Sequence, residues 1–161
     1  MVKAEAIEAL LYGCSRWTLP QEHYSKLRTV HHRMLLRIIG AQRKRSNHRV
    51  TSFNLAIEMT RCESIETTLR TRSFLRAGAL SRMSGGRLPK RIMFGNLEGA
   101  MRGGRDGKEK EWIDCVQSDV RAFGTAGDWK ATALEAEVWV DTVTEGGRRF
   151  MAAEVRKGRC G

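Results

Sequence analysis

Hydrophobic residues recur at helical spacing between Glu22 and Gly40. Residues three, four and seven positions apart share one face of a helix, so this spacing predicts an amphipathic helix that packs against a core. Gly40 follows the last apolar residue, where a left-handed glycine commonly ends a helix. His31 flanks the apolar stripe, and His32 is expected to point away from it. The stripe consists of Tyr24, Leu27, Val30, Met34, Leu35, Ile38 and Ile39.

A second face of this predicted helix is basic and leads into a basic loop. Lys26, Arg33 and Arg37 are seven and four residues apart, so they line one side away from the stripe. The following loop adds Arg43, Lys44, Arg45 and Arg49. Two interpretations stay open. The cations form either an ordinary solvated face or a face that lies along a phosphate backbone.

The same periodicity predicts helices along the rest of the chain. Asp128 is the expected N-cap of one of them. Trp112, Trp129 and Trp139 lie on predicted helices as core anchors, whereas Trp17 lies in a connector. The helices are expected over residues 1–13, 50–59, 64–83, 89–94 and 108–123, from Asp128 to a break at Gly146-Gly147, and over residues 148–157.

Gly78 lies inside the predicted helix over residues 64–83, where glycine is about 1 kcal/mol less favourable than alanine. A close crossing with a second helix would explain this glycine, and so would neutral drift. The polar sides of the same helix carry Arg70, Arg72, Arg76 and Arg82.

A glycine-rich stretch divides the chain. Residues 84–107 contain 7 of its 16 glycines, without the GxxxxGK[ST] pattern of a phosphate-binding loop. We therefore expect an all-α, helical bundle-like fold in three segments. These are a basic helical part at residues 1–84, a Gly-rich linker with one short helix at residues 85–107, and a smaller C-terminal helical part at residues 108–161.

The positive charge is concentrated in the first of these parts. The chain has a formal net charge of +11 and a pI of about 10.2. Residues 1–90 hold 17 Lys and Arg against 6 Asp and Glu, whereas residues 91–161 hold 12 of each, so the whole excess lies within residues 1–90. Such a balance indicates an anionic partner and does not determine the fold.

No catalytic or metal-binding pattern is present. The cysteines form no CxxC pair, and the histidines are not at zinc-finger spacing from them. We expect a reduced intracellular protein, nuclear or cytoplasmic, without a cofactor or a small-molecule substrate. No apolar run approaches the roughly 18 residues of a membrane span, so no membrane association is expected. The residues concerned are Cys14, Cys62, Cys115 and Cys160, and His23, His31, His32 and His48.

Four segments carry a further signal: LLYGCSRWTL (10–19), LRTVHHRMLLRIIG (27–40), RLPKRIMFG (87–95) and EWIDCVQSDVRAFG (111–124). In order and spacing they resemble the region downstream of the reverse-transcriptase palm in non-LTR (LINE-type) retrotransposon polyproteins. That family carries Tyr-Gly and a tryptophan, a basic LxxxHxRxLRxIxG helix, an arginine-rich helix, an RLP…FG block and a Trp-Asp-Cys-Val helix. The resemblance covers about residues 5–125.

Two departures limit what this resemblance implies. The family usually has an aromatic residue and a histidine near the glycine of its arginine-rich helix, where this chain has Arg76 and Ala79 around Gly78. A polymerase also needs carboxylates that converge on Mg²⁺. This sequence has no Tyr-x-Asp-Asp, and its aspartates are scattered. The resemblance therefore implies a detached, thumb-like helical fragment, without the endonuclease domain, that holds template and primer against a palm encoded elsewhere.

We accordingly expect a non-catalytic, sequence-independent nucleic-acid-binding fragment rather than an enzyme. Its expected partners are the RNA or DNA backbone and, by the resemblance, a reverse-transcriptase palm domain. No aromatic residue is interleaved with the basic run, so no base-stacking platform is expected there. The alternative is a decayed helix-packing fragment with no independent biochemical activity. The expected phosphate contacts are Lys26, Arg33, Arg37, Arg43, Lys44, Arg45 and Arg49.

Overall fold

The computed structural model describes residues 2–19, 21–40, 53–94, 112–124 and 128–157. All regular structure within these ranges is helical, which confirms the all-α prediction. The elements are α1 (Val2–Leu10), the 3₁₀ turn η1 (Cys14–Arg16), α2 (Gln21–Ile38), α3 (Phe53–Thr60), α4 (Ile65–Ser81), α5 (Leu88–Phe94), α6 (Trp112–Ala122), α7 (Trp129–Thr132) and α8 (Ala136–Lys157).

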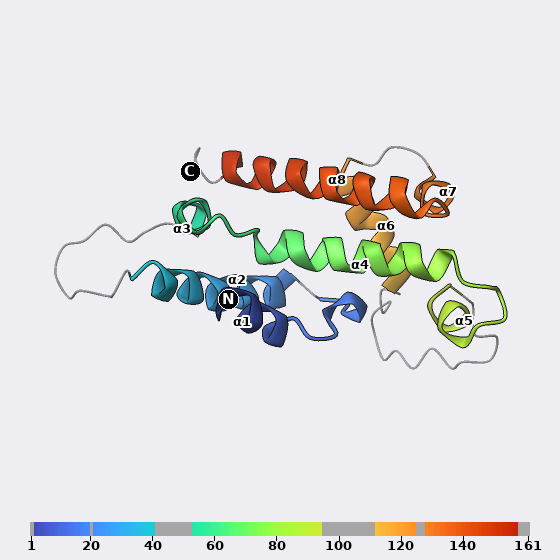
Figure 1. Cartoon of the computed structure of the whole chain (residues 1–161), viewed down its shortest axis with the longest axis horizontal. Coiled ribbons are helices and arrows are strands. Elements are labelled where there is room, and N and C mark those ends of the chain that lie inside the picture. Colours follow the sequence, from blue (N-terminus) through green and yellow to red (C-terminus); the bar gives the residue numbers. More distant parts are fainter. Residues whose placement is uncertain (1, 20, 41–52, 95–111, 125–127, 158–161) are drawn as a thin grey trace.

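Helix α4 lies in the middle of the molecule. Figure 1 shows α8 antiparallel to it along one side, and α2 with α1 along the other. Helix α4 contacts α8, η1, α6, α2 and α5, whereas α3 contacts mainly α2. The arginine-rich helix of the sequence is therefore the central helix of the fold.

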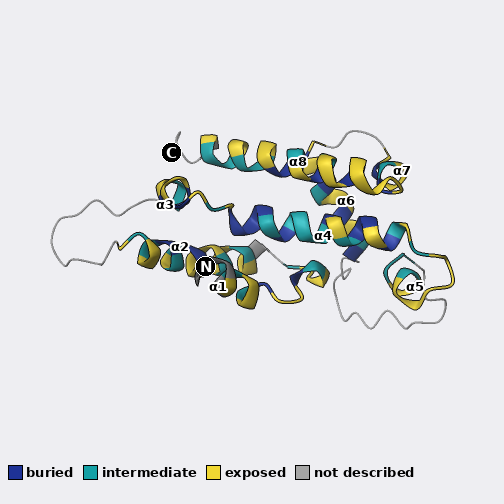
Figure 2. Cartoon of the chain, viewed as in Figure 1, coloured by how far each residue is buried: buried dark blue, intermediate teal, exposed yellow. Residues whose placement is uncertain are grey.

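The largest core cluster joins both of the predicted helical parts. Figure 2 shows buried residues on the facing sides of α4 and α8. The tryptophans expected as core anchors are all buried in this cluster. The two helical parts therefore share one hydrophobic core. It contains Phe74, Ala77 and Leu80 of α4, Trp112, Val116 and Val120 of α6, and Phe123, Trp129, Ala133, Trp139 and Val143.

Helices α4 and α8 cross closely at Gly78. A Cβ atom at this position would lie 2.3 Å from the indole of Trp139, so any larger residue would collide with it. The indole Nε1–H donates a hydrogen bond of 2.9 Å to the carbonyl oxygen of Phe74. The structure thus contains the close helix crossing that the sequence analysis gave as one explanation for Gly78.

The predicted helix break at Gly146-Gly147 is wrong. Helix α8 continues through both glycines to Lys157. A Cβ atom at Gly146 would lie 2.9 Å from the ring of Phe123, so this glycine allows close approach rather than a break. The interruption occurs earlier, where α7 ends at Thr132.

Helix α2 is rotated relative to the stripe that its sequence predicts. Leu35 is buried, but Val30 and Ile38 each keep 41% of their surface exposed, so their predicted inward placement is wrong. Arg28 and His31 take part of the inner face instead, because α4 and α3 place Glu66 and Phe53 against them. The helix ends as predicted, with Gly40 in the left-handed conformation at φ 69°.

Replacing Gly78 with alanine tests the close crossing. The added methyl group would meet an indole that is only 1% exposed and is held by its hydrogen bond to Phe74. Overpacking costs about 1–3 kcal/mol, whereas alanine gains roughly 1 kcal/mol over glycine in a helix. Because the contact of 2.3 Å is severe, the cost is expected at the upper end of this range. We therefore expect Gly78→Ala to lower the free energy of unfolding by about 2 kcal/mol, as measured by urea denaturation.

Gly85→Ala is the matched control, because a Cβ atom at Gly85 meets no atom within 4 Å. Its free energy of unfolding should stay within about 0.5 kcal/mol of that of the natural chain. Equal stability of the two variants would contradict the close crossing.

Candidate nucleic-acid interface

Arg70 of α4 is engaged within the fold. Its guanidinium lies 3.1 Å from a carboxylate oxygen of Asp119 on α6 and 3.8 Å from one of Glu66. It also packs over the rings of Tyr24 and Phe150, with centroids 5.3 and 4.6 Å away. Only 14% of its side chain is exposed. Arg70 therefore joins four helices and is not available to a phosphate.

Arg72 of α4 and Arg82, which caps the end of α4, also bind neighbouring elements. Arg72 forms an ion pair with Glu8 of α1. Arg82 donates a hydrogen bond of 2.7 Å to the carbonyl oxygen of Ala133, which follows α7. The sequence places these arginines on the polar sides of the helix, and the structure turns those sides toward other elements. Arg70, Arg72 and Arg82 therefore bind within the fold.

A second polar cluster joins α2, α4 and α8. The Arg28 guanidinium lies 2.7 Å from an oxygen of Glu66 and 3.2 Å from one of Glu154. The Ser64 hydroxyl donates a hydrogen bond of 3.0 Å to the other Glu154 oxygen. Burial, followed by hydrogen bonding to Glu66 and repulsion by it, raises the pKa of Glu154 to about 7. Both carboxylates face the Arg28 guanidinium, and Glu66 also lies near that of Arg70.

The outer face of α2 presents cations to solvent. Lys26, Arg33 and Arg37 are all exposed and lie on the side opposite buried Leu35. Among the described residues, no carboxylate pairs with Arg33 or Arg37. Lys26 pairs with Glu22 at 2.6 Å, but 67% and 73% of the two side chains are exposed. Such an exposed pair contributes little to the stability of the fold.

The remaining candidate contacts, Arg43, Lys44, Arg45 and Arg49, lie outside the described residues. The structure therefore brings three of the seven sequence-predicted residues onto one helix face. In the sequence, the basic loop follows directly after the end of this helix.

A pocket of about 590 Å³ lies at the N-terminal end of α2. The chain turns back here, which brings Trp17 of the connector beside Lys26 of the helix. Sequence reasoning missed this pocket because the connector has no periodic pattern. The sequence does contain one indication of it. Arg16 and Trp17 directly precede Thr18 and Pro20, residues typical of the start of a helix, so a basic and an aromatic side chain are expected at the beginning of α2. The lining residues are Arg16, Trp17, Thr18, Leu19, His23, Lys26 and Leu27.

His31 belongs to the core and not to the interface. It is 1% exposed, and neither ring nitrogen has a hydrogen-bond partner among the residues that the structure describes. Burial, then the neighbouring His32, lowers the pKa of His31 below its ordinary value, so the neutral ring is favoured. His32 does not point away as predicted, because its half-buried ring packs edge-on against Phe53 at 5.6 Å.

Among the described cysteines, Cys14, Cys62 and Cys115 form no disulfide, and Cys160 lies outside the described residues. Within the described ranges, no three His, Cys, Asp or Glu side chains come together as a metal-binding group. Of the helices placed in the structure, none combines the length and apolarity needed to cross a membrane.

Comparison of the chain with known protein families, with curated proteins and with solved structures finds no match. A functional proposal therefore rests on two things: the contrast between the paired arginines and the exposed cations of α2, and the sequence resemblance.

Replacing Glu154 tests the polar cluster. A raised pKa means that the folded chain holds the proton more tightly than the unfolded chain. This contribution to stability is complete below the ordinary value of 4.5 and is lost as pH rises through about 7. We expect Glu154→Gln to gain stability relative to the natural chain over this interval, as measured by urea denaturation at a series of pH values.

Asp141→Asn, an exposed change on the same helix, is the control. Its stability difference from the natural chain should vary much less with pH. A pH-independent difference for Glu154→Gln would show that this carboxyl group does not titrate as described.

Proposed function

We propose that this chain is a non-catalytic, sequence-independent nucleic-acid-binding fragment, equivalent to the thumb-like region of a non-LTR retrotransposon reverse transcriptase. One observation carries the proposal: Arg33 and Arg37 are exposed without a carboxylate partner in the described structure, whereas Arg28, Arg70 and Arg72 are paired. The resemblance to the post-palm region supplies the biological setting.

The outer face of α2 has suitable dimensions for a phosphate backbone. Lys26 and Arg37 are separated by about 16 Å along the helix axis, at 1.5 Å per residue. In the sequence, Arg43, Lys44, Arg45 and Arg49 extend the positive charge beyond Gly40. Contacts from Lys and Arg to phosphates fix position and carry no base information, so the binding is expected to be sequence-independent.

The resemblance adds a protein partner to the proposal. A thumb-like region acts beside a palm domain, so we propose a reverse-transcriptase palm as the protein partner. Several large apolar side chains remain exposed, including Tyr12 at 87%, Met59 at 60% and Leu55 at 47%. A palm domain that covered such residues would remove apolar surface from water.

The same exposed residues also favour the alternative, a helix-packing fragment with no independent activity. Solubility and thermal unfolding separate the two. The proposed binding fragment is soluble, melts cooperatively and retains affinity for RNA or DNA. Aggregation without a cooperative transition, together with no binding at low salt, would favour the alternative.

The double variant Arg33→Ala/Arg37→Ala tests the outer face. We expect it to weaken binding to single-stranded RNA by about tenfold at low salt without changing the melting temperature. The slope of log K against log salt should become shallower by about 1.4, because each phosphate contact to a single strand contributes about 0.7. Adding Arg43→Ala, Lys44→Ala and Arg45→Ala should weaken binding further and leave the helices folded.

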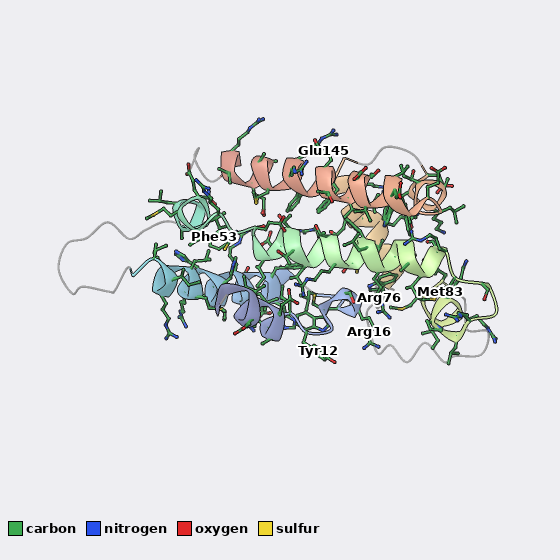
Figure 3. All side chains as sticks on the ribbon, viewed as in Figure 1. Tyr12, Arg16, Phe53, Arg76, Met83 and Glu145 are labelled. Carbon is green, nitrogen blue, oxygen red and sulfur yellow. The ribbon has the colours of Figure 1, made fainter. Side chains whose placement is uncertain are left out.

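Arg148→Ala/Arg149→Ala is the matched control. It removes the same charge from exposed positions on α8, where both arginines lie beside Glu145. Figure 3 shows Glu145 on the side of the molecule opposite Tyr12 and Arg16. An equal loss of affinity in the two double variants would mean that net charge alone, and not the α2 face, determines binding.

Glu22→Gln tests whether the ion pair with Lys26 competes with phosphate. Removing this carboxylate frees one cation, so binding to single-stranded RNA should tighten several-fold and the salt slope should steepen by about 0.7. Asp141→Asn changes the net charge equally on α8 and should have a smaller effect. Unchanged affinity for Glu22→Gln would place Lys26 outside the binding face.

A further inference from the structure

Trp17 differs from the other tryptophans of the chain. It keeps 37% of its surface exposed, whereas Trp112, Trp129 and Trp139 are exposed by 8%, 4% and 1%. Its neighbours around the pocket include three basic side chains, those of Arg16, His23 and Lys26. A core role accounts for the buried tryptophans but leaves the exposure of Trp17 unexplained.

The connector presents Trp17 from a fixed position. The Trp17 backbone N–H donates a hydrogen bond of 3.0 Å to the carbonyl oxygen of Cys14, a residue that is 2% exposed. Next to it, the carbonyl oxygen of Ser15 accepts a hydrogen bond of 3.2 Å from the indole of Trp112 on α6. Because these contacts hold the turn in place, a ligand on Trp17 would meet an already ordered surface.

The lining of the pocket suits a flat aromatic group attached to an anion. Trp17, Leu19 and Leu27 supply apolar surface, and Arg16 and Lys26 supply positive charge. The volume of about 590 Å³ falls within the range of small-ligand sites. A nucleobase with its sugar-phosphate has this combination of properties. Stacking of a base on an aromatic side chain contributes about 1–3 kcal/mol and tolerates any base.

We infer that this pocket holds one unstacked base of a single-stranded nucleic acid on Trp17, with its neighbouring phosphates on Arg16 and Lys26. The inference rests on the proposed function and adds a preference for single strands over duplexes. Lys26 belongs both to the pocket and to the outer face of α2. The strand therefore continues from the pocket along Arg33 and Arg37. Bases within a duplex are already stacked and do not reach Trp17.

Three variants test the pocket by fluorescence anisotropy. Trp17→Ala should weaken binding to a labelled single strand about tenfold, within the range expected for loss of one stacked base. Affinity for a long blunt duplex and the salt slope should not change, because no charge is lost. Trp17→Phe should keep most of the affinity. Tyr12→Ala removes an aromatic residue that is 87% exposed and lies outside the pocket, so it should bind like the natural chain.

Tryptophan emission supplies a second measurement that a purely structural role would not affect. A single strand should quench the emission of the natural chain, whereas Trp17→Phe should bind without this quenching. RNA and DNA strands of the same sequence are tested in parallel, and quenching by either supports the pocket. If Trp17→Ala does not fold, as judged by its thermal melt, the pocket is tested by comparing the quenching of the natural chain with that of Trp17→Phe.

The outcomes separate the pocket from the proposed function. No binding of any strand by the natural chain at low salt would overturn both. Binding that Trp17→Ala leaves unchanged, or weakens equally for single strands and duplexes, would overturn the pocket alone. Quenching of Trp17→Phe by a single strand would also overturn the pocket alone.

Discussion

Trp139 of α8 occupies the space that a side chain at Gly78 of α4 would fill, and the packing of these two long helices depends on this contact. The hydrogen bond to the carbonyl oxygen of Phe74 satisfies the buried indole N–H, so the ring is buried without an unpaired polar group. Helix α4 lies between α8 and α2 (Figure 1). Its close approach to α8 therefore also determines where the carboxylates of α8 lie relative to the cations of α2.

This arrangement separates cations that pair with carboxylates inside the fold from cations that are exposed on the outer side of α2. Glu154, near the far end of α8, reaches Arg28 on the inner side of α2, and Asp119 of α6 pairs with Arg70. Carboxylates of the nearly neutral C-terminal part thus neutralise some of the positive charge of the N-terminal part. Arg33 and Arg37, on the outer side of α2, have no such partner among the described residues. Part of the positive charge that the sequence shows is therefore used inside the fold, whereas the outer face of α2 keeps exposed cations.

Local signals predicted much of the fold, because helix ends are determined by neighbouring residues. Ser64 and Asp128 cap helices through their side chains, and Gly40 ends α2 in the left-handed conformation. Features that depend on distant residues were not predictable. Arg28 and Glu154 are 126 positions apart, and Arg70 and Asp119 are 49 apart, so no local pattern separates paired from exposed arginines. The same reason explains the wrong break at Gly146-Gly147, where tertiary contact with Phe123 outweighs the low helix propensity of glycine.

The division of the arginines into two groups is the central claim, and chemical modification tests it within one molecule. The folded chain is treated with phenylglyoxal, with and without single-stranded RNA, and the modified arginines are identified by mass spectrometry. Arg33 and Arg37 should react readily in the free chain and become protected by RNA, whereas Arg70, with 14% of its side chain exposed, should react slowly in both states. Equal reactivity of Arg70 and Arg33 in the free chain, or no protection of Arg33 and Arg37 by RNA, would contradict the account.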